Sequence, residues 1–202
     1  MRILAIGAHP DDIEEGCSGY LIKKLADGSK IAHLLITDGS KRGNKTIRIK
    51  EQTEALKILK PTDSFRLDIQ DCHTDGIIQE LITKIESIVE EWKPNMILTH
   101  FPHDTHHDHR IVSQASLEAG RYVPTILFYE SASTRDFDPT HYCDITNMID
   151  DKIRIIKCFE SQLDVIGISD GKAVRTLSEY RGYQSKLRFK FAEAFKAYRD
   201  VL

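Results

Sequence analysis

The sequence lacks an apolar run long enough to cross a membrane, and it lacks any block of basic residues. A transmembrane helix needs about 20 consecutive apolar residues, and no segment of the 202-residue chain approaches that length. Lys and Arg are scattered and the formal net charge is −3, so nucleic acid is not an expected partner. The start, MRILAIGAHPDD, has one Arg and a short apolar run without a cleavage-site pattern. We therefore expect a strand there and no signal peptide.

Paired cysteines are also absent. The four cysteines stand far apart and form no C-x-x-C pair: Cys17, Cys72, Cys143 and Cys158. This usage favours reduced, mostly structural thiols in a cytosol-like compartment, which predicts a cytoplasmic protein. The chain contains no internal repeat, low-complexity segment or linker. Its length suits one sizeable core, so we expect a single domain over residues 1–202.

Short β-branched runs alternate with longer helical periods along the chain. Strands are expected at residues 2–7, 30–37, 64–69, 96–99 and 125–129, and helices at residues 14–26, 46–59, 76–92, 109–120, 147–160 and 186–199. This alternation predicts a single-domain, Rossmann-like α/β fold, with a mostly parallel sheet and helices on both faces.

Polar residues follow three of the expected strands. The first strand is followed by AHPDD, the second by TDGSKRG and the fourth by HFPHDTHHDHR. Ligands of open parallel sheets bind beyond the carboxyl ends of the strands. The sequence therefore predicts a functional site at this edge of the sheet.

Histidine and aspartate at this edge are suited to a metal ion. Five of the nine histidines lie between His100 and His109, and His106 and His109 share one side if a helix begins there. Such a set suits Zn²⁺, with Mn²⁺, Fe²⁺ or Co²⁺ as substitutes. Catalytic zinc takes three protein ligands and keeps one open position. His9 and Asp12 can supply two ligands from one turn, and either His106 or His109 the third.

The adjacent Asp11 lies close to these ligands without having to bind the ion. A carboxylate there can take a proton from zinc-bound water, whose pKa the metal lowers to about 7. A cation also offsets the repulsion between Asp11 and Asp12. The structural alternative is that one of the two is only a helix N-cap. Lone histidines usually pack in the core, which is our expectation for His33 and His73.

The motifs AHPDDIE and DTHHDHR, in this order, resemble those of the PIG-L/LmbE-like de-N-acetylases. These are zinc enzymes that remove acetyl groups from N-acetylglucosamine-type sugars. Further counterparts follow in the same order along nearly the whole chain: ITDGS, RIKEQTEA, THFPHDTHHDHR, CDIT and FAEAF. The resemblance implies metal-assisted hydrolysis of an amide. It also implies His9, Asp12 and His109 as metal ligands, and Asp11 as the general base that later protonates the leaving amine.

The resemblance also assigns roles outside the metal ligands. His106 matches a histidine that stabilises the tetrahedral oxyanion, with Asp108 orienting it. Arg48 and Glu51 match an R-x-x-E pair whose Arg lies near the substrate. Some members use a mobile tyrosine, for which Tyr129 is a weak candidate against ordinary strand-end packing. The sequence leaves open whether His100, His103 and His107 take part.

The substrate is expected to be a small N-acetylated sugar or sugar conjugate, with residues 39–46 and 131–142 as the loops that contact it. An amidase or esterase acting on another acylated compound stays open, because the shared residues handle the acyl group and not its carrier. A receiver-like phospho-acceptor module is a remote alternative, since TILFYESAST supplies no Lys after the fifth strand. A nucleotide-binding Rossmann module is weaker still without G-x-G-x-x-G. A homo-oligomer is compatible with the sequence.

Overall fold

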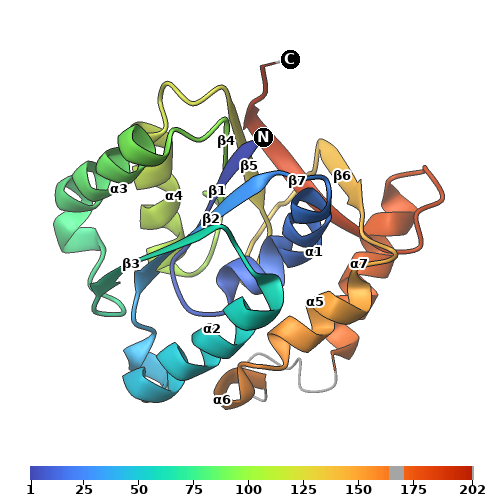
Figure 1. Ribbon diagram of the computed structural model, residues 1–202, viewed down its shortest axis with the longest axis horizontal. Coiled ribbons are helices and arrows are strands. Elements are labelled where there is room, and N and C mark those ends of the chain that lie inside the picture. Colours follow the sequence, from blue (N-terminus) through green and yellow to red (C-terminus); the bar gives the residue numbers. More distant parts are fainter. Residues whose placement is uncertain (164–170, 202) are drawn as a thin grey trace.

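A seven-stranded sheet runs through the computed structural model, which describes residues 1–163 and 171–201 (Figure 1). The strand order is β3-β2-β1-β4-β5-β7-β6. The strands are β1 (Arg2–Gly7), β2 (Lys30–Thr37), β3 (Asp63–Ile69), β4 (Met96–His100), β5 (Thr125–Tyr129), β6 (His141–Asp144) and β7 (Ala192–Arg199). β1 to β5 are parallel, whereas β7 runs antiparallel to both β5 and β6.

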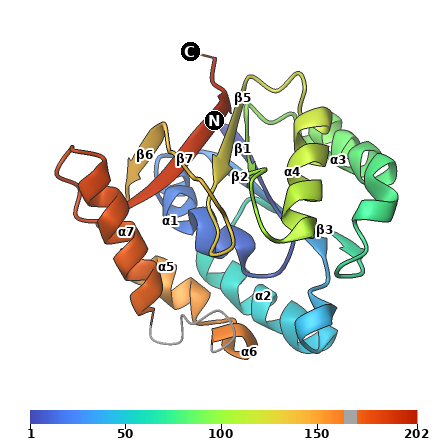
Figure 2. The ribbon, with the colours of Figure 1, turned by 180° about the vertical axis from the view of Figure 1, so that it is seen from behind.

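Helices cover both faces of the sheet (Figures 1 and 2). They are α1 (Asp12–Ala26), α2 (Lys45–Leu59), α3 (Ile78–Trp92), α4 (His107–Ala119), α5 (Ile149–Ile156), α6 (Glu160–Leu163) and α7 (Lys172–Gln184), with short 3₁₀ helices at Ser40–Arg42 and Asp75–Ile77. α3 and α4 pack on one face, and α1, α2 and α5 pack on the other. None of the described helices is both long and apolar enough to cross a membrane.

Alternating side chains of the strands build the two cores. In β1, Leu4 and Ile6 face α3 and α4, whereas Ile3 and Ala5 face α1 and α2. This alternation is the two-residue period of a strand, and both sets are apolar because both faces are covered. β1 pairs in parallel with β2 and with β4, so the segments that follow these three strands emerge at one edge.

The expected α/β class is confirmed, and the expected elements up to residue 156 are present with small shifts at their ends. The helix predicted over residues 186–199 is wrong, because β7 occupies Ala192–Arg199. Ala, Glu and Lys in this stretch favour a helix, but antiparallel pairing with β5 on one side and β6 on the other outweighs that weak preference. The prediction also missed β6 and α7.

A buried ion pair from the C-terminal part of the chain holds α1 near its middle. Lys152 Nζ lies 2.5 Å from Glu193 Oε1 and also donates to the backbone oxygen of Glu15 at 2.5 Å. The Glu193 carboxylate accepts from the amides of Gly19 at 2.9 Å and Tyr20 at 2.6 Å. Both charged side chains are almost fully buried, so each needs these partners. The pair thereby fixes the helix whose first residue is Asp12.

Gly16 permits close approach between α1 and β5. A Cβ atom at this position would lie 2.2 Å from Cδ2 of Tyr129, well inside van der Waals contact. The Tyr129 ring is fully buried, and its hydroxyl donates to the backbone oxygen of Ile6 at 2.8 Å. Tyr129 is therefore a buried, hydrogen-bonded residue at the end of β5. This agrees with the alternative of ordinary strand-end packing.

Candidate active site

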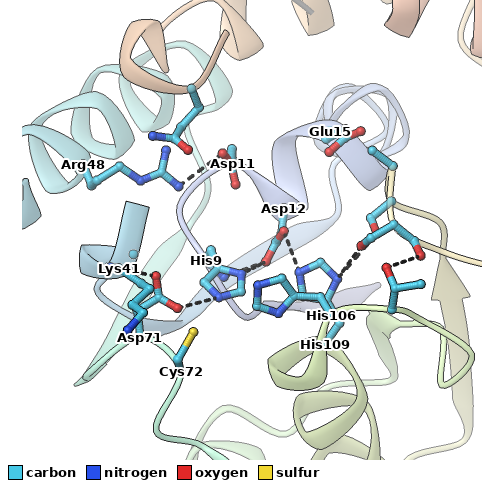
Figure 3. Close-up of a pocket in the computed structure, with 16 residues that line it drawn as sticks. His9, Asp11, Asp12, Glu15, Lys41, Arg48, Asp71, Cys72, His106 and His109 are labelled. Carbon is cyan, nitrogen blue, oxygen red and sulfur yellow. Dashed lines mark hydrogen bonds and ion pairs between the residues drawn. The ribbon is translucent and has the colours of Figure 1, made fainter. Parts of the chain in front are cut away.

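The turn between β1 and α1 separates the two adjacent aspartates. His9 N donates to Asp12 Oδ2 at 2.6 Å, and His9 Nδ1 lies 3.3 Å from the same oxygen. Asp11 has φ 110°, a left-handed conformation that non-glycine residues rarely adopt. Asp11 points toward Arg48, while Asp12 points toward the histidines (Figure 3). The strained turn thus gives the neighbouring carboxylates different surroundings.

His109 connects Asp12 to a second buried carboxylate. His109 Nε2 lies 3.2 Å from Asp12 Oδ1, and its Nδ1 lies 3.0 Å from Asp104 Oδ2. Asp104 also accepts from Ser131 Oγ at 2.9 Å and from Thr134 Oγ1 at 3.1 Å. A carboxylate on the far nitrogen fixes the tautomer and orientation of a metal-binding imidazole. Asp104 is therefore in the position of an orienting partner for His109.

The electrostatics of this cluster favour a cation. Burial alone would lower the pKa of His109, but Asp12 and Asp104 outweigh it and raise that pKa to about 9. The pKa of His9 is likewise raised against burial, by Asp12, Asp108 and Asp71. The histidines in turn hold the pKa of Asp12 well below its usual range, although burial opposes this. Buried nitrogen and oxygen donors in a field that attracts positive charge fit an ion of the Zn²⁺ type.

Three overlapping groups of side chains around these residues can hold such an ion. The ligating atoms of His9, His106 and His109 lie within 4.8 Å of one another, and so do those of Asp12, His100 and His109 and those of His9, Asp71 and Asp108. His100 Nε2 accepts from the amide of Ala8 at 3.1 Å, which engages that nitrogen. Burial lowers the pKa of His100 to about 4, with His109 adding to the effect. His100 is thus a neutral, hydrogen-bonded neighbour, and its ring stacks on that of His109.

His106 and His109 share one side of α4, as their spacing predicts. α4 begins at His107, with His106 as its N-cap, and the two rings stack with centroids 4.7 Å apart. His106 is half-buried, and its Nδ1 has no hydrogen-bond partner among the described residues. Burial lowers the pKa of His106, and the positive charges of His9 and His109 lower it further. A neutral imidazole can still donate one hydrogen bond.

Asp11 has a pKa suited to proton transfer. Burial raises it, Arg48 opposes that rise, and Asp12 adds to it, which leaves the pKa at about 7. Arg48 Nη2 donates to Asp11 Oδ2 at 3.2 Å and to the backbone oxygen of Pro10 at 2.5 Å. Glu51 lies 4.0 Å from Arg48 Nη1 and accepts from the amide of Ser161. Arg48 therefore lines the pocket and contacts Asp11 directly, whereas Glu51 contacts Arg48 from outside the lining.

Asp108 contacts His9, which differs from the expected arrangement. Its Oδ2 lies 3.1 Å from His9 Nε2 and accepts from the amide of Cys72 at 3.0 Å. Its Oδ1 accepts from the Thr74 hydroxyl. Within the described residues, no hydrogen bond joins Asp108 to His106. The expectation that Asp108 orients His106 is not met, because the two oxygens of Asp108 are occupied by His9 and by Cys72 and Thr74 of the loop after β3.

Sequence reasoning missed two carboxylates at the site. Asp71, in the loop after β3, lies 3.2 Å from His9 Nε2, and Asp104 holds His109. Asp71 follows the carboxyl end of β3, and Asp104 lies inside the histidine-rich segment that follows β4. The expectation that ligands bind beyond the carboxyl ends of the strands could therefore have indicated both residues. His33 is buried between Glu14 and Gln52 as expected. The expectation for His73 is wrong, because it is exposed in the loop after β3.

A pocket of about 420 Å³ opens onto these residues (Figure 3). Arg48 and Lys41 lie on one side and Glu15 on the other, with Asp11 between them in this view. Residues 39–46 contribute Gly39 and Lys41, and residues 131–142 contribute Ser131, Ala132 and Ser133. Both predicted substrate loops therefore border the pocket. His103 and Tyr129 are not part of its lining.

Comparison with known proteins agrees with this architecture. The family model described as PIG-L, GlcNAc-PI de-N-acetylase, matches residues 4–120. The uncharacterized deacetylase YaiS of Escherichia coli strain K12 is 38% identical over 138 residues, which cover 65% of this chain and 75% of the relative. Diacetylchitobiose deacetylase of Thermococcus kodakarensis is 28% identical over 220 residues, covering 93% of this chain and 80% of the relative.

A solved structure extends the comparison to the fold. The N,N'-diacetylchitobiose deacetylase of Pyrococcus horikoshii, in complex with its inhibitor MPG, superposes with a TM-score of 0.82 at 22% identity. The superposition covers 97% of this chain and 83% of that one. The family match includes β1 from Leu4 onward, the turn with both aspartates and the whole of α4. The chain belongs to the PIG-L family of de-N-acetylases.

Proposed function

We propose that this protein is a metal-dependent N-deacetylase acting on a small N-acetylated amino sugar or its conjugate in the cytoplasm. One observation carries the proposal: Asp11, with a pKa of about 7, shares a pocket with the buried cluster of His9, Asp12 and His109. Membership of the family and the names of the deacetylase relatives support the acetamide as the reacting group. The proposed unit is one domain over residues 1–202.

His9, Asp12 and His109 are the proposed ligands of a Zn²⁺ ion, for which Mn²⁺, Fe²⁺ or Co²⁺ can substitute. Lewis-acid activation of the acetyl carbonyl and of water is the chemistry that such an ion supplies when bound. Asp104 and Asp108 hold the far nitrogens of His109 and His9, respectively. The imidazoles therefore keep one tautomer and one orientation toward the shared pocket.

Asp11 is the proposed proton carrier. It accepts a proton from the water that attacks the acetyl carbon, and it then donates that proton to the amine nitrogen as the carbon–nitrogen bond breaks. Acetic acid and the free amine leave and ionise to acetate and an ammonium group, and Asp11 returns to its ionised form, so atoms and charge balance. A pKa of about 7 allows the same group to act as base and acid near neutral pH. The guanidinium of Arg48 stabilises the ionised form of Asp11 between these steps.

His106 is the proposed donor to the developing oxyanion. It lies on the pocket wall beside His109, and one ring nitrogen has no partner among the described residues. Removing one oxyanion donor typically costs about 2.7–4 kcal/mol in a hydrolase. Replacement of His106 by Ala should therefore lower kcat by about 10²–10³-fold and leave metal binding largely intact.

The charged walls of the pocket suit a polar, hydroxylated substrate. Lys41 and Arg48 can contact an acceptor such as a carbonyl, phosphate or sugar oxygen, and the Glu15 carboxylate can accept from a hydroxyl. Glu15 lines the pocket without taking part in the proposed chemistry. An N-acetylated sugar presents both kinds of group next to its acetamide.

The test is acetate release from a panel of N-acetylated sugars and their nucleotide conjugates by the zinc-loaded protein. We expect acetate with at least one sugar, no acetate from the metal-stripped protein, and no acetate from the Asp11→Asn variant. Asp27→Asn is a matched control, because Asp27 is an exposed carboxylate at the C-terminal end of α1, outside the pocket lining and both substrate loops. Full activity of the metal-stripped protein would refute the mechanism. Acetate from none of the sugars would favour an amidase or esterase acting on another acylated compound.

A further inference from the structure

A second group of metal-ligating side chains lies beside the catalytic pocket. One ligating atom each of Cys72, His107 and Asp108 falls within 4.8 Å of the other two. Cys72 follows β3 in the chain, whereas His107 and Asp108 begin α4. His107 Nε2 lies 3.2 Å from Asp108 Oδ1. We propose that these three residues form a second metal site, separate from the one at His9, Asp12 and His109.

The donor set indicates which ions this site would take. A thiolate favours Zn²⁺ and Co²⁺ over hard ions such as Mg²⁺ and Ca²⁺, and the imidazole suits the same metals. Three protein ligands leave a fourth position of a tetrahedral ion to water. Asp108 is fully buried, while Cys72 and His107 are partly exposed. An ion can therefore reach the site from solvent past Cys72 and His107 and bind the buried carboxylate of Asp108.

The Cys72 thiol is in no disulfide, and its charged neighbours include the carboxylates of Asp71 and Asp108. All four cysteines are free, and within the described residues Cys72 is the one cysteine that comes together with two further ligating side chains. Its sulfur belongs to the pocket lining and lies near Asp71 and His9 in Figure 3. A metal ion on Cys72 would therefore place positive charge at the wall of the catalytic pocket.

Asp108 links the second site to the first. Its Oδ2 lies 3.1 Å from His9 Nε2, and its Oδ1 faces His107 and accepts from the Thr74 hydroxyl. An ion bound by Cys72, His107 and Asp108 shares the Asp108 carboxylate with His9 and draws negative charge away from it. His9 keeps Asp71 at 3.2 Å, but its contact with Asp108 is weakened. The second ion should therefore inhibit the enzyme, and the site responds to excess thiophilic metal.

Cobalt titration of the metal-free protein tests the site without relying on activity. We expect two equivalents of Co²⁺ to bind, and the second to produce a thiolate-to-cobalt charge-transfer absorption in the near ultraviolet. Cys72→Ser should abolish this absorption and the second equivalent while retaining the first. His107→Ala should weaken the second equivalent at least tenfold. Cys143→Ser, which alters a partly buried thiol elsewhere, should retain both equivalents.

Two results would overturn the assignment: no charge-transfer absorption in the native protein with excess Co²⁺, or the same absorption in Cys72→Ser. Thermal unfolding of each variant checks that it is folded. The inhibitory effect rests on the proposed function and has its own arm, in which excess Zn²⁺ should inhibit the native enzyme. Cys72→Ser and His107→Ala should need at least tenfold more Zn²⁺. Equal inhibition of all three proteins would refute the regulatory role and leave the deacetylase proposal untouched.

Discussion

Replacement of Asp104 by Asn should weaken metal binding at the first site. Asp104 accepts from four donors: His109 Nδ1 at 3.0 Å, Ser131 Oγ at 2.9 Å, Thr134 Oγ1 at 3.1 Å and the amide of His106 at 2.8 Å. Asn keeps the shape of the side chain, but it loses the charge and replaces one acceptor oxygen with a donor. The imidazole of His109 then loses the anion that orients it and increases its basicity.

The expected size of the effect follows from comparable changes at other metal sites. Loss of a carboxylate behind a metal-binding histidine typically lowers metal affinity 10–100-fold, which corresponds to about 1.4–2.8 kcal/mol. Competition for Zn²⁺ against a chromophoric chelator at fixed pH measures this directly. Asp138→Asn removes an exposed carboxylate from the β5–β6 connection, which also carries Ser131 and Thr134, and should leave the affinity unchanged.

The result that would refute this reasoning is a folded Asp104→Asn protein with an affinity within about twofold of the native value, far below the expected loss. Such a result would mean that the Asp104–His109 contact stabilises the fold without tuning the metal ligand. A separate measurement distinguishes a structural role of Asp104 from tuning of the metal ligand. Asp104 is one of the groups that raise the pKa of His109, so Asp104→Asn should also lower that pKa in the metal-free protein. Histidine titration by NMR would detect that change.

Three further predictions follow. In the metal-free protein the pKa of His109 is raised from 6.5 to about 9. Protonated His109 therefore stabilises the fold fully below about pH 6.5, and this stabilisation is lost as the pH rises through 9. A thermal midpoint that rises over this pH interval would contradict the prediction. Arg48→Gln removes a charge that lowers the pKa of Asp11, so the lower-pH limb of the kcat/KM profile should move to higher pH, and an unmoved limb would contradict the assignment of Asp11 as base. Gly16→Ala places a Cβ against Tyr129 and should cost about 1–3 kcal/mol in urea unfolding; a change below about 0.5 kcal/mol, typical of surface positions, would mean that the packing relaxes.

The edge that carries the site could be predicted from the sequence. Apolar runs with AHPDD and DTHHDH at their ends imply parallel strands with polar carboxyl ends, and β1 and β4 place these segments together. Local periodicity could not decide the C-terminal region, because Ala192–Arg199 contains good helix formers and becomes a strand only through its two neighbours. Such pairing is a tertiary effect that a short window of sequence does not contain.

The partners of the site residues were harder to predict than their identities. Asp108 lies two residues from His106 in the sequence, yet it faces His9, because the loop after β3 delivers Cys72 and Thr74 to the same carboxylate. Long-range contacts of this kind depend on strand order, which the sequence pattern did not specify. The family resemblance supplied residue types and an order of motifs, but the hydrogen bonds came only from the fold.

The buried Lys152–Glu193 pair makes the metal site depend on residues that are synthesised late. The family match ends at residue 120 and includes every proposed ligand of the first metal site, but α1 is held by residues synthesised much later. Chains emerge from the ribosome N-terminus first, so the turn with both aspartates leaves it long before Glu193 does. We therefore expect the metal site to mature only after β7 has been synthesised, and a nascent chain stalled before β7 to bind the ion poorly.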